Sequence, residues 1–231
     1  MEKWSAVTIM DDLISVIIPC RNGVNYLAEA VAGIRKQDMP LEIIVVDDAS
    51  TDATAALAGR LSCRVLRHET MRGQVAGKNT GLQAAQGEYV LFHDHDDVMN
   101  EGALSKMRLE LVADNDLYLV MAKVRDFFSP ELDEETKRAV QIRTEPYYGL
   151  FTGAVLMRRS LFDLIGYFDE QITSGEIIAL MAKMDAMAGV KHKKIDFIAA
   201  NRRVHKTNYG LTHADKERQD YLKILRAKLR R

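Results

Sequence analysis

Three carboxylates and two imidazoles stand in a row at residues 93 to 97, His-Asp-His-Asp-Asp, directly after the apolar run from Tyr89 to Phe92. Packing does not explain such a cluster, because neighbouring carboxylates repel one another and raise one another's pKa. A divalent cation relieves this repulsion, and oxygen ligands suit Mg²⁺ or Mn²⁺, which also bind the phosphates of substrates. The cluster therefore predicts a metal site in which Asp96 is a ligand.

The two histidines of this cluster are expected to have a different role. Successive side chains of an extended chain alternate, so Asp94 and Asp96 should point to one side. The imidazoles of His93 and His95 should then point to the opposite side, where we expect them to pack or form hydrogen bonds rather than ligate the metal. Asp97 has a second interpretation, as a cap on the turn that follows.

Polar residues also follow two earlier apolar runs. Asp47 and Asp48 end the run 41–48, and Pro19, Arg21 and Asn22 lie where the first run ends. A carboxylate in such a place can accept hydrogen bonds from the base or ribose of a nucleotide. Because the residues that follow are rich in capping types, a turn or helix cap is the alternative role for Asp47.

Apolar runs and helical patterns alternate along the first half of the chain. Strands that alternate with helices predict a parallel sheet with right-handed crossovers, so the expected fold class is α/β, with a Rossmann-like, mostly parallel central sheet flanked by helices. Ligands of such sheets bind outside the carboxyl ends of the strands, where the polar clusters should therefore meet. The predicted strands are 13–20, 41–48, 63–68 and 88–94, and the predicted helices are 25–37, 50–61 and a segment that ends before Gly87.

The composition changes near Arg125, where a polar and weakly periodic stretch begins. We expect residues 125–149 to form a loop or lid with a short acidic helix. The last segment, 212–231, has the pattern of a basic amphipathic helix, which could dock on an anionic membrane surface or pack on its own domain or a second subunit. The other elements expected in this half are strands at 150–158 and 193–199, helices at 159–165 and within 173–190, and a loop at 200–210.

The overall composition excludes several classes of protein. The formal net charge of the 231 residues is -1, from 32 basic and 33 acidic residues, which argues against a general nucleic-acid surface. Cys20 and Cys63 form no disulfide framework, which favours a reducing compartment. No apolar run has the length of a signal-peptide core or a membrane span. The expected location is the cytoplasm, with contact at a membrane face left open.

The motifs of the first 99 residues resemble those of the family 2 glycosyltransferases, which have the GT-A fold. The usual forms in that family are a strand ending in Pro-x-x-Asn, a Val-Asp-Asp-x-Ser-x-Asp turn, an Arg-Asn-x-Gly helix and an Asp-x-Asp-Asp strand end. Each is weak alone, but all four occur here in order. In this chain they are "SVIIPCRN", "IIVVDDASTD", "GKNTG" and "HDHDD", with fainter likeness in "FTGAVLMRRSLFDLIGYFDE" and "RRVHKTNYG".

The resemblance implies a role for each matching residue. His205 would approach the metal or diphosphate from the loop near the end, with an ordinary loop histidine as the alternative. Lys78 would face the diphosphate, with a solvated helix lysine as the alternative. The implied metal ligands are Asp96 and His205, and the implied nucleotide-sugar-binding residues are Pro19, Arg21, Asn22, Asp47, Asp48, Lys78, Asp94 and Asp96.

One departure from the family concerns the general base. The family usually places an aspartate after Gly-Glu, and here that position is held by Ile177. The nearest carboxylate is Glu176, which we expect to be the catalytic base. Its alternative role is that of a carboxylate in the first turn of a helix, where the helix dipole favours it.

The resemblance implies a single GT-A glycosyltransferase domain over residues 1–231. Residues 13–122 would form the nucleotide-sugar-binding half, 123–212 the acceptor-side half and 213–231 a C-terminal helix that contacts a membrane surface or a dimer partner. The implied reaction is inverting, needs Mn²⁺ or Mg²⁺, and moves a sugar from a nucleotide-diphosphate donor, a UDP-sugar being favoured. The acceptor is open between a glycan, a lipid-linked molecule and a peptide. The alternative, supported by Ile177, is a GT-A-like protein that binds a nucleotide or partner with little or no catalysis.

Overall fold

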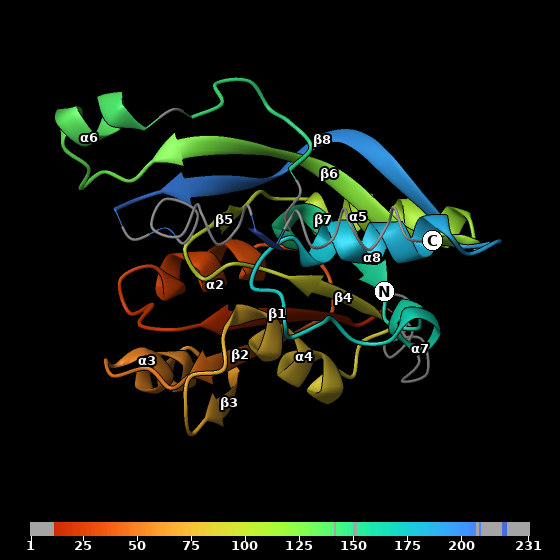
Figure 1. Cartoon of the computed structure of the whole chain (residues 1–231), viewed down its shortest axis with the longest axis horizontal. Coiled ribbons are helices and arrows are strands. Elements are labelled where there is room, and N and C mark those ends of the chain that lie inside the picture. The colour runs from red at the N-terminus through yellow and green to blue at the C-terminus, as the bar shows by residue number, and fades with distance from the viewer. Residues whose placement is uncertain (1–11, 141, 150–151, 207, 209–218, 221–231) are drawn as a thin grey trace, which may run out of the picture.

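The computed structural model describes residues 12–140, 142–149, 152–206, 208 and 219–220 (Figure 1). Its strands are β1 (Ile14–Cys20), β2 (Leu41–Asp48), β3 (Arg64–His68), β4 (Tyr89–Phe92), β5 (Val98–Met99), β6 (Leu117–Phe128), β7 (Val155–Arg158) and β8 (Lys191–Val204). Its helices are α2 (Leu27–Arg35), α3 (Thr54–Arg60), α4 (Gln74–Ala84), α5 (Ala103–Ala113), α6 (Glu134–Ala139), α7 (Leu161–Ile165) and α8 (Glu176–Asp185), with a 3₁₀ turn, η1, at Thr152–Ala154.

The described strands form one sheet in the order β3-β2-β1-β4-β7-β6-β8-β5. β1 pairs in parallel with β2 and β4, and β2 pairs in parallel with β3, so the predicted parallel half is confirmed. Only β7 and the short β5 run antiparallel to their neighbours. The mixed, mostly parallel sheet with flanking helices confirms the expected fold class.

Helices cover both faces of this sheet. Every residue of β1 is buried, as its β-branched run predicts for a strand between two layers. Alternation sends Val16 into an apolar cluster with α2, α3 and α5, and sends Ile17 into a second cluster with α4, α7 and α8. The two clusters form the hydrophobic core on the two faces of the sheet.

Helix α4 lies so close to β1 that one of its positions must be glycine. A methyl group on Gly81 would overlap Cγ2 of Ile17, a buried β-branched side chain that cannot swing away. Gly59 in α3 is also helical, but open space surrounds it. The two glycines therefore form a matched pair for measuring how tightly α4 is packed.

We expect Gly81→Ala to lower the free energy of unfolding by about 1–3 kcal/mol, because the added methyl group overpacks the interface. Gly59→Ala should instead raise it by about 0.5–1 kcal/mol, since alanine restricts the unfolded chain and meets nothing in the fold. Urea denaturation of both variants measures the difference. Equal stability of the two variants would contradict this account of the packing.

Two boundaries of the second half differ from the prediction. Residues 125–128 were expected to begin a loop, but they continue β6, and residues 200–204 were expected to form a loop, but they continue β8. The two strands pair in parallel along most of their length, with bulges, so their polar residues still have the backbone partners that a sheet supplies. The expected short acidic helix is confirmed as α6, which is capped by Asp133.

Other elements were incompletely predicted. Helix α5, strand β5 and the first part of β6 were not predicted from the sequence. The strand expected at 150–158 is confirmed only as β7, preceded by η1, and the helix expected within 173–190 is α8. The predicted helix 212–231 lies outside the described residues, apart from Gln219 and Asp220, which are helical. Within the described ranges, every helix is too short or too polar to span a bilayer.

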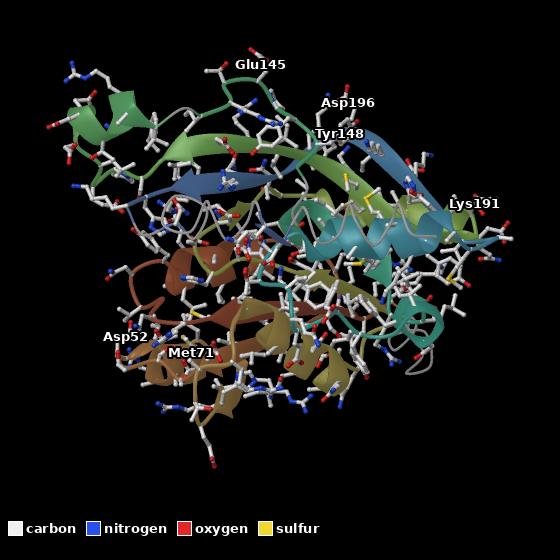
Figure 2. All side chains as sticks on the ribbon, viewed as in Figure 1. Asp52, Met71, Glu145, Tyr148, Lys191 and Asp196 are labelled. Atoms are coloured by element: carbon white, nitrogen blue, oxygen red, sulfur yellow. The ribbon has the colours of Figure 1, made fainter. Side chains whose placement is uncertain are left out.

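The carboxyl ends of the parallel strands meet at one edge. The arrowheads of β1, β6 and β8 point to the left of Figure 1. Asp52, just after β2, and Met71, just before α4, lie on this side of Figure 2, while Lys191 lies at the opposite end. The polar clusters that follow β1, β2 and β4 therefore share one edge, as predicted.

Candidate active site

Asp96 and His205 form the first of two charged pairs at this edge. The Nε2 atom of His205 lies 2.8 Å from Oδ2 of Asp96, although the residues are 109 positions apart. The amide of Asn208 also reaches Oδ2 of Asp96, at 3.4 Å. The turn after β4 thus meets the segment after β8. This contact brings His205 to the predicted metal ligand Asp96.

Lys78 and Glu176 form the second pair. Lys78 on α4 is only 2% exposed, so its alternative role as a solvated lysine is wrong. Its Nζ donates to Oγ1 of Thr152 at 2.9 Å and to Oε1 of Glu176, the first residue of α8. The predicted phosphate ligand and the predicted base are therefore in direct contact.

Asp94 interacts with both pairs. Gln74, at the start of α4, donates from Nε2 to Oδ1 of Asp94 at 2.6 Å. Burial raises the pKa of Asp94, the positive charge of Lys78 opposes that rise, and the charges of Asp96 and Glu176 add to it. The net effect is a raised pKa, so Asp94 holds its negative charge less firmly than an exposed aspartate does.

Asp96 has the opposite balance. Burial alone would raise its pKa, but the hydrogen bond with His205 and the charge of His95 outweigh it, so the pKa of Asp96 is lowered. An ionised carboxylate is a ligand that suits Mn²⁺ or Mg²⁺, and the imidazole nitrogen beside it is a further donor atom. No group of three or more His, Cys, Asp or Glu residues within the described ranges is arranged around a metal position. The pair fits a cation that takes its other ligands from phosphates and water.

The two histidines of the cluster pack against the protein. Because β4 ends at Phe92, strict alternation does not continue through the cluster. His93 is fully buried, and burial lowers its pKa to about 4, so the ring is neutral at pH 7. His95 lies against Gly23, where a methyl group would overlap both His95 and Cys20. Their packing agrees with the expectation from the sequence.

The acids at the end of β2 have partners within the protein. Asp47 is fully buried, accepts a hydrogen bond from the Ser50 backbone at 3.2 Å and pairs with Arg67 at 3.2 Å, which matches its alternative role in a turn. Asp48 accepts hydrogen bonds from the backbone N–H groups of Arg72 and Gly73, both at 2.8 Å. It also contacts Nδ1 of His68 at 2.7 Å. Asp48 thereby fixes the loop that leads into α4.

We expect Asp48→Asn to destabilise the protein at neutral pH by about 1–3 kcal/mol, because an amide cannot accept from Arg72, Gly73 and His68 together. Burial opposes ionisation of Asp48, but these hydrogen bonds win and lower its pKa. A lowered pKa stabilises the fold above the unfolded value of about 3.9 and loses that effect as pH falls. Urea titrations at pH 7, 5 and 3.5 should show the two proteins converging in acid, and a constant difference would contradict this.

The end of β1 is tied to the same turn. Asn22, which has a positive φ of 52°, donates from its backbone to Oγ of Ser50 at 2.9 Å. Its side-chain oxygen accepts from the Thr51 backbone at 2.9 Å. Pro19 is buried against Gly77 of α4, and Arg21 is exposed. These residues border the edge where the two charged pairs lie.

Sequence reasoning missed several residues that contact the predicted ones. Asn208 had a signal, since it completes the His-x-x-Asn part of the segment "RRVHKTNYG". Gln74 and Thr152 had none, because each is an ordinary polar residue whose partner lies on another element. Arg203 had the same signal as Asn208, since it is the first residue of the Arg-x-His-x-x-Asn motif in that segment. It had no assigned role, although it contacts the cluster from β8.

Comparison with known proteins gives one family match and a set of structural neighbours. The family described as Glycosyl transferase family 2 matches residues 15–168. Glycosyltransferase GlyG of Streptococcus pneumoniae is 38% identical over 104 residues, which are 42% of this chain and 35% of that protein. The chain thus spans about a third of that relative's length.

Two solved structures share the fold. Staphylococcus aureus TarS 1-349 in complex with UDP-GlcNAc has a TM-score of 0.72 at 24% identity, covering 93% of this chain and 65% of that one. The mannosyltransferase PcManGT from Pyrobaculum calidifontis, in complex with GDP-Man and Mn²⁺, has a TM-score of 0.71 at 22% identity, covering 94% of this chain and 64% of that one.

Proposed function

This chain belongs to glycosyl transferase family 2, and from that premise we propose that it transfers a sugar from a nucleotide-diphosphate donor to an acceptor, with inversion and with Mn²⁺ or Mg²⁺ bound. The observation that carries the proposal is the meeting of the two charged pairs, Asp96 with His205 and Lys78 with Glu176, at the carboxyl edge of the sheet. One pair suits a metal diphosphate, and the other contains a carboxylate that can accept a proton.

The donor side of the proposal uses the first half of the chain, 13–122. Pro19, Arg21, Asn22 and Asp48 would border the nucleotide, and Asp47 would support them from its buried position. TarS binds UDP-GlcNAc and PcManGT binds GDP-Man, so proteins of this fold include binders of uridine and of guanosine diphosphate sugars. We favour a UDP-sugar for this chain.

Asp96 and His205 would hold the cation. A bound Mn²⁺ or Mg²⁺ would neutralise the charge that develops on the departing diphosphate. The lowered pKa of Asp96 keeps this carboxylate ionised, so its negative charge is available to a cation. Lys78 adds a buried positive charge near Asp94, which would touch the ribose or the sugar.

Glu176 would be the general base. Ile177, which holds the family's usual aspartate position, is fully buried in the core, so that position offers no base here. Glu176 is 8% exposed, and Lys78 binds its Oε1. The ion pair would orient the carboxylate so that Oε2 can take the acceptor's proton as the new glycosidic bond forms.

The acceptor side would be built by residues 123–212. This half contributes Glu176 and His205. It also contains the segment with α6, and we propose that this segment contacts the acceptor. The acceptor's class stays open between a glycan, a lipid-linked molecule and a peptide. A cytoplasmic location, and contact of 213–231 with a membrane surface or a second subunit, also stay predictions.

Calorimetric titration with UDP, GDP and dTDP, each with and without Mn²⁺, tests the donor site. Binding of one nucleotide only in the presence of metal would support the proposal and identify the base. The matching nucleotide-sugar is then incubated with the protein, and its slow hydrolysis is followed. Absence of all nucleotide binding would refute the donor site. Tight binding with no hydrolysis or transfer would favour a protein that only binds its nucleotide.

A further inference from the structure

The side chain of Arg203, near the end of β8, joins three elements around the metal-binding pair. It is 4% exposed, and its Nε donates to the backbone carbonyl of Asp96 at 2.9 Å. Its Nη2 atom forms an ion pair with the carboxylate of Glu29 on α2. The central carbon of its guanidinium lies 4.6 Å from the ring centre of Phe127 on β6. A planar cation with directional donors can make these contacts at once.

The backbone of Arg203 is fixed to the same cluster. Its N–H donates to Oδ1 of Asp97 at 2.8 Å, and its carbonyl accepts from the amide of Asn208 at 3.1 Å. Asp97 therefore points to β8 rather than to the donor side, which gives the third carboxylate of the cluster a structural role. Asp96 and Asp97 are both tied to one residue of β8, two positions before His205.

The orientation of His205 depends on the same guanidinium. The guanidinium of Arg203 lies 5.2 Å from the ring centre of Tyr26, at the start of α2. The Tyr26 ring lies 4.7 Å from the ring of His205, centre to centre. One face of the imidazole is thus against Tyr26, while its Nε2 is directed at Asp96.

We propose that Arg203 is a positioning residue that sets the relative placement of Asp96 and His205. Its effect on nucleotide binding rests on the proposed function, but the positioning itself does not. Both groups sit on irregular backbone after their strands, where neighbouring side chains must hold them in place. Replacing a residue that hydrogen-bonds to a metal ligand and orients it typically lowers the metal affinity by about 10–100-fold.

The test compares Arg203→Lys with Arg158→Lys. Lysine keeps the positive charge at position 203, but its single ammonium group cannot reproduce the fixed planar arrangement with which the guanidinium binds both Asp96 and Glu29. Arg158 is a matched control, because it too makes several contacts, to the carbonyls of Leu117 and Leu111 at 3.1 and 2.6 Å and to Glu88 at 2.8 Å. It pairs with the start of β4, at the opposite edge of the sheet.

The first readout is hydrogen exchange in the protein without ligand. We expect Arg203→Lys to speed exchange in peptides covering 93–97 and 203–206 by at least about tenfold, while Arg158→Lys leaves these peptides unchanged. Wild-type exchange in Arg203→Lys would overturn the proposal, whatever the protein binds. Equal acceleration in both variants would also overturn it, because the effect would then be a general loss of stability.

The second readout is the affinity for Mn²⁺ with the nucleoside diphosphate that the wild type binds. We expect Arg203→Lys to weaken it by about 10–100-fold and Arg158→Lys to change it less than about twofold. If Arg203→Lys alters exchange but the wild type binds no nucleotide with metal, the positioning role stands and the proposed function fails. If the wild type binds and Arg203→Lys binds equally well, the positioning role is refuted.

Discussion

Asp96→Asn is expected to lower the rate of sugar transfer by about 10²–10³-fold and to abolish the metal dependence of nucleotide binding. The amide has nearly the shape of the carboxylate and can still meet His205, so the fold should be preserved. What it lacks is the negative charge that a divalent cation needs when water and phosphate supply the other ligands. Calorimetry with and without Mn²⁺, together with kcat for donor hydrolysis, measures both effects.

Asp185→Asn is the control for this experiment. Asp185, at the end of α8, also faces a histidine, His192, at 3.4 Å, but that pair lies where α8 leads into the start of β8, away from the site. The control should bind nucleotide and metal like the wild type. Metal-dependent binding that survives Asp96→Asn would mean that the cation, if any, is held elsewhere.

The parallel half of the fold was predictable because its signals are local. β1 and β2 are nearly continuous apolar runs; β2 ends in Asp47 and Asp48, and Arg21 and Asn22 directly follow β1. β6 and β8 carry arginine, aspartate and lysine among their apolar residues, so their far halves looked like loops. The backbone hydrogen bonds between β6 and β8 keep both segments extended as strands. This pairing cannot be read from the sequence pattern of either strand alone.

The site was predictable in its parts and not in its pairings. Asp96 was recognisable by its residue type, because several carboxylates crowded at a strand end have few structural reasons to be there. His205, Lys78 and Glu176 were recognisable only through the resemblance to the family. That Lys78 binds Glu176 could not be predicted, since 98 residues separate them. This pairing adds to the expected role of Lys78: besides facing the diphosphate, it would hold Glu176, the proposed base.

Lys78 and Glu176 give the second large prediction. Glu176→Gln should lower kcat by about 10²–10⁴-fold, since an amide cannot accept the acceptor's proton. Nucleotide affinity should stay within a few-fold of the wild type, because Asp96 and His205 are unchanged. Steady-state kinetics with the donor identified by calorimetry separates kcat from KM.

Stability separates the catalytic role of this pair from its structural one. Lys78→Met leaves the Glu176 carboxylate buried without its ammonium partner, and should cost about 3–5 kcal/mol in urea denaturation. The double variant Lys78→Met/Glu176→Leu should recover most of that loss, because replacing both members of a buried ion pair by apolar residues is often neutral. A stable double variant without transfer activity would show that the pair is kept for chemistry. If that variant still transferred sugar at the wild-type rate, Glu176 could not be the base, and the proton would have to leave without it.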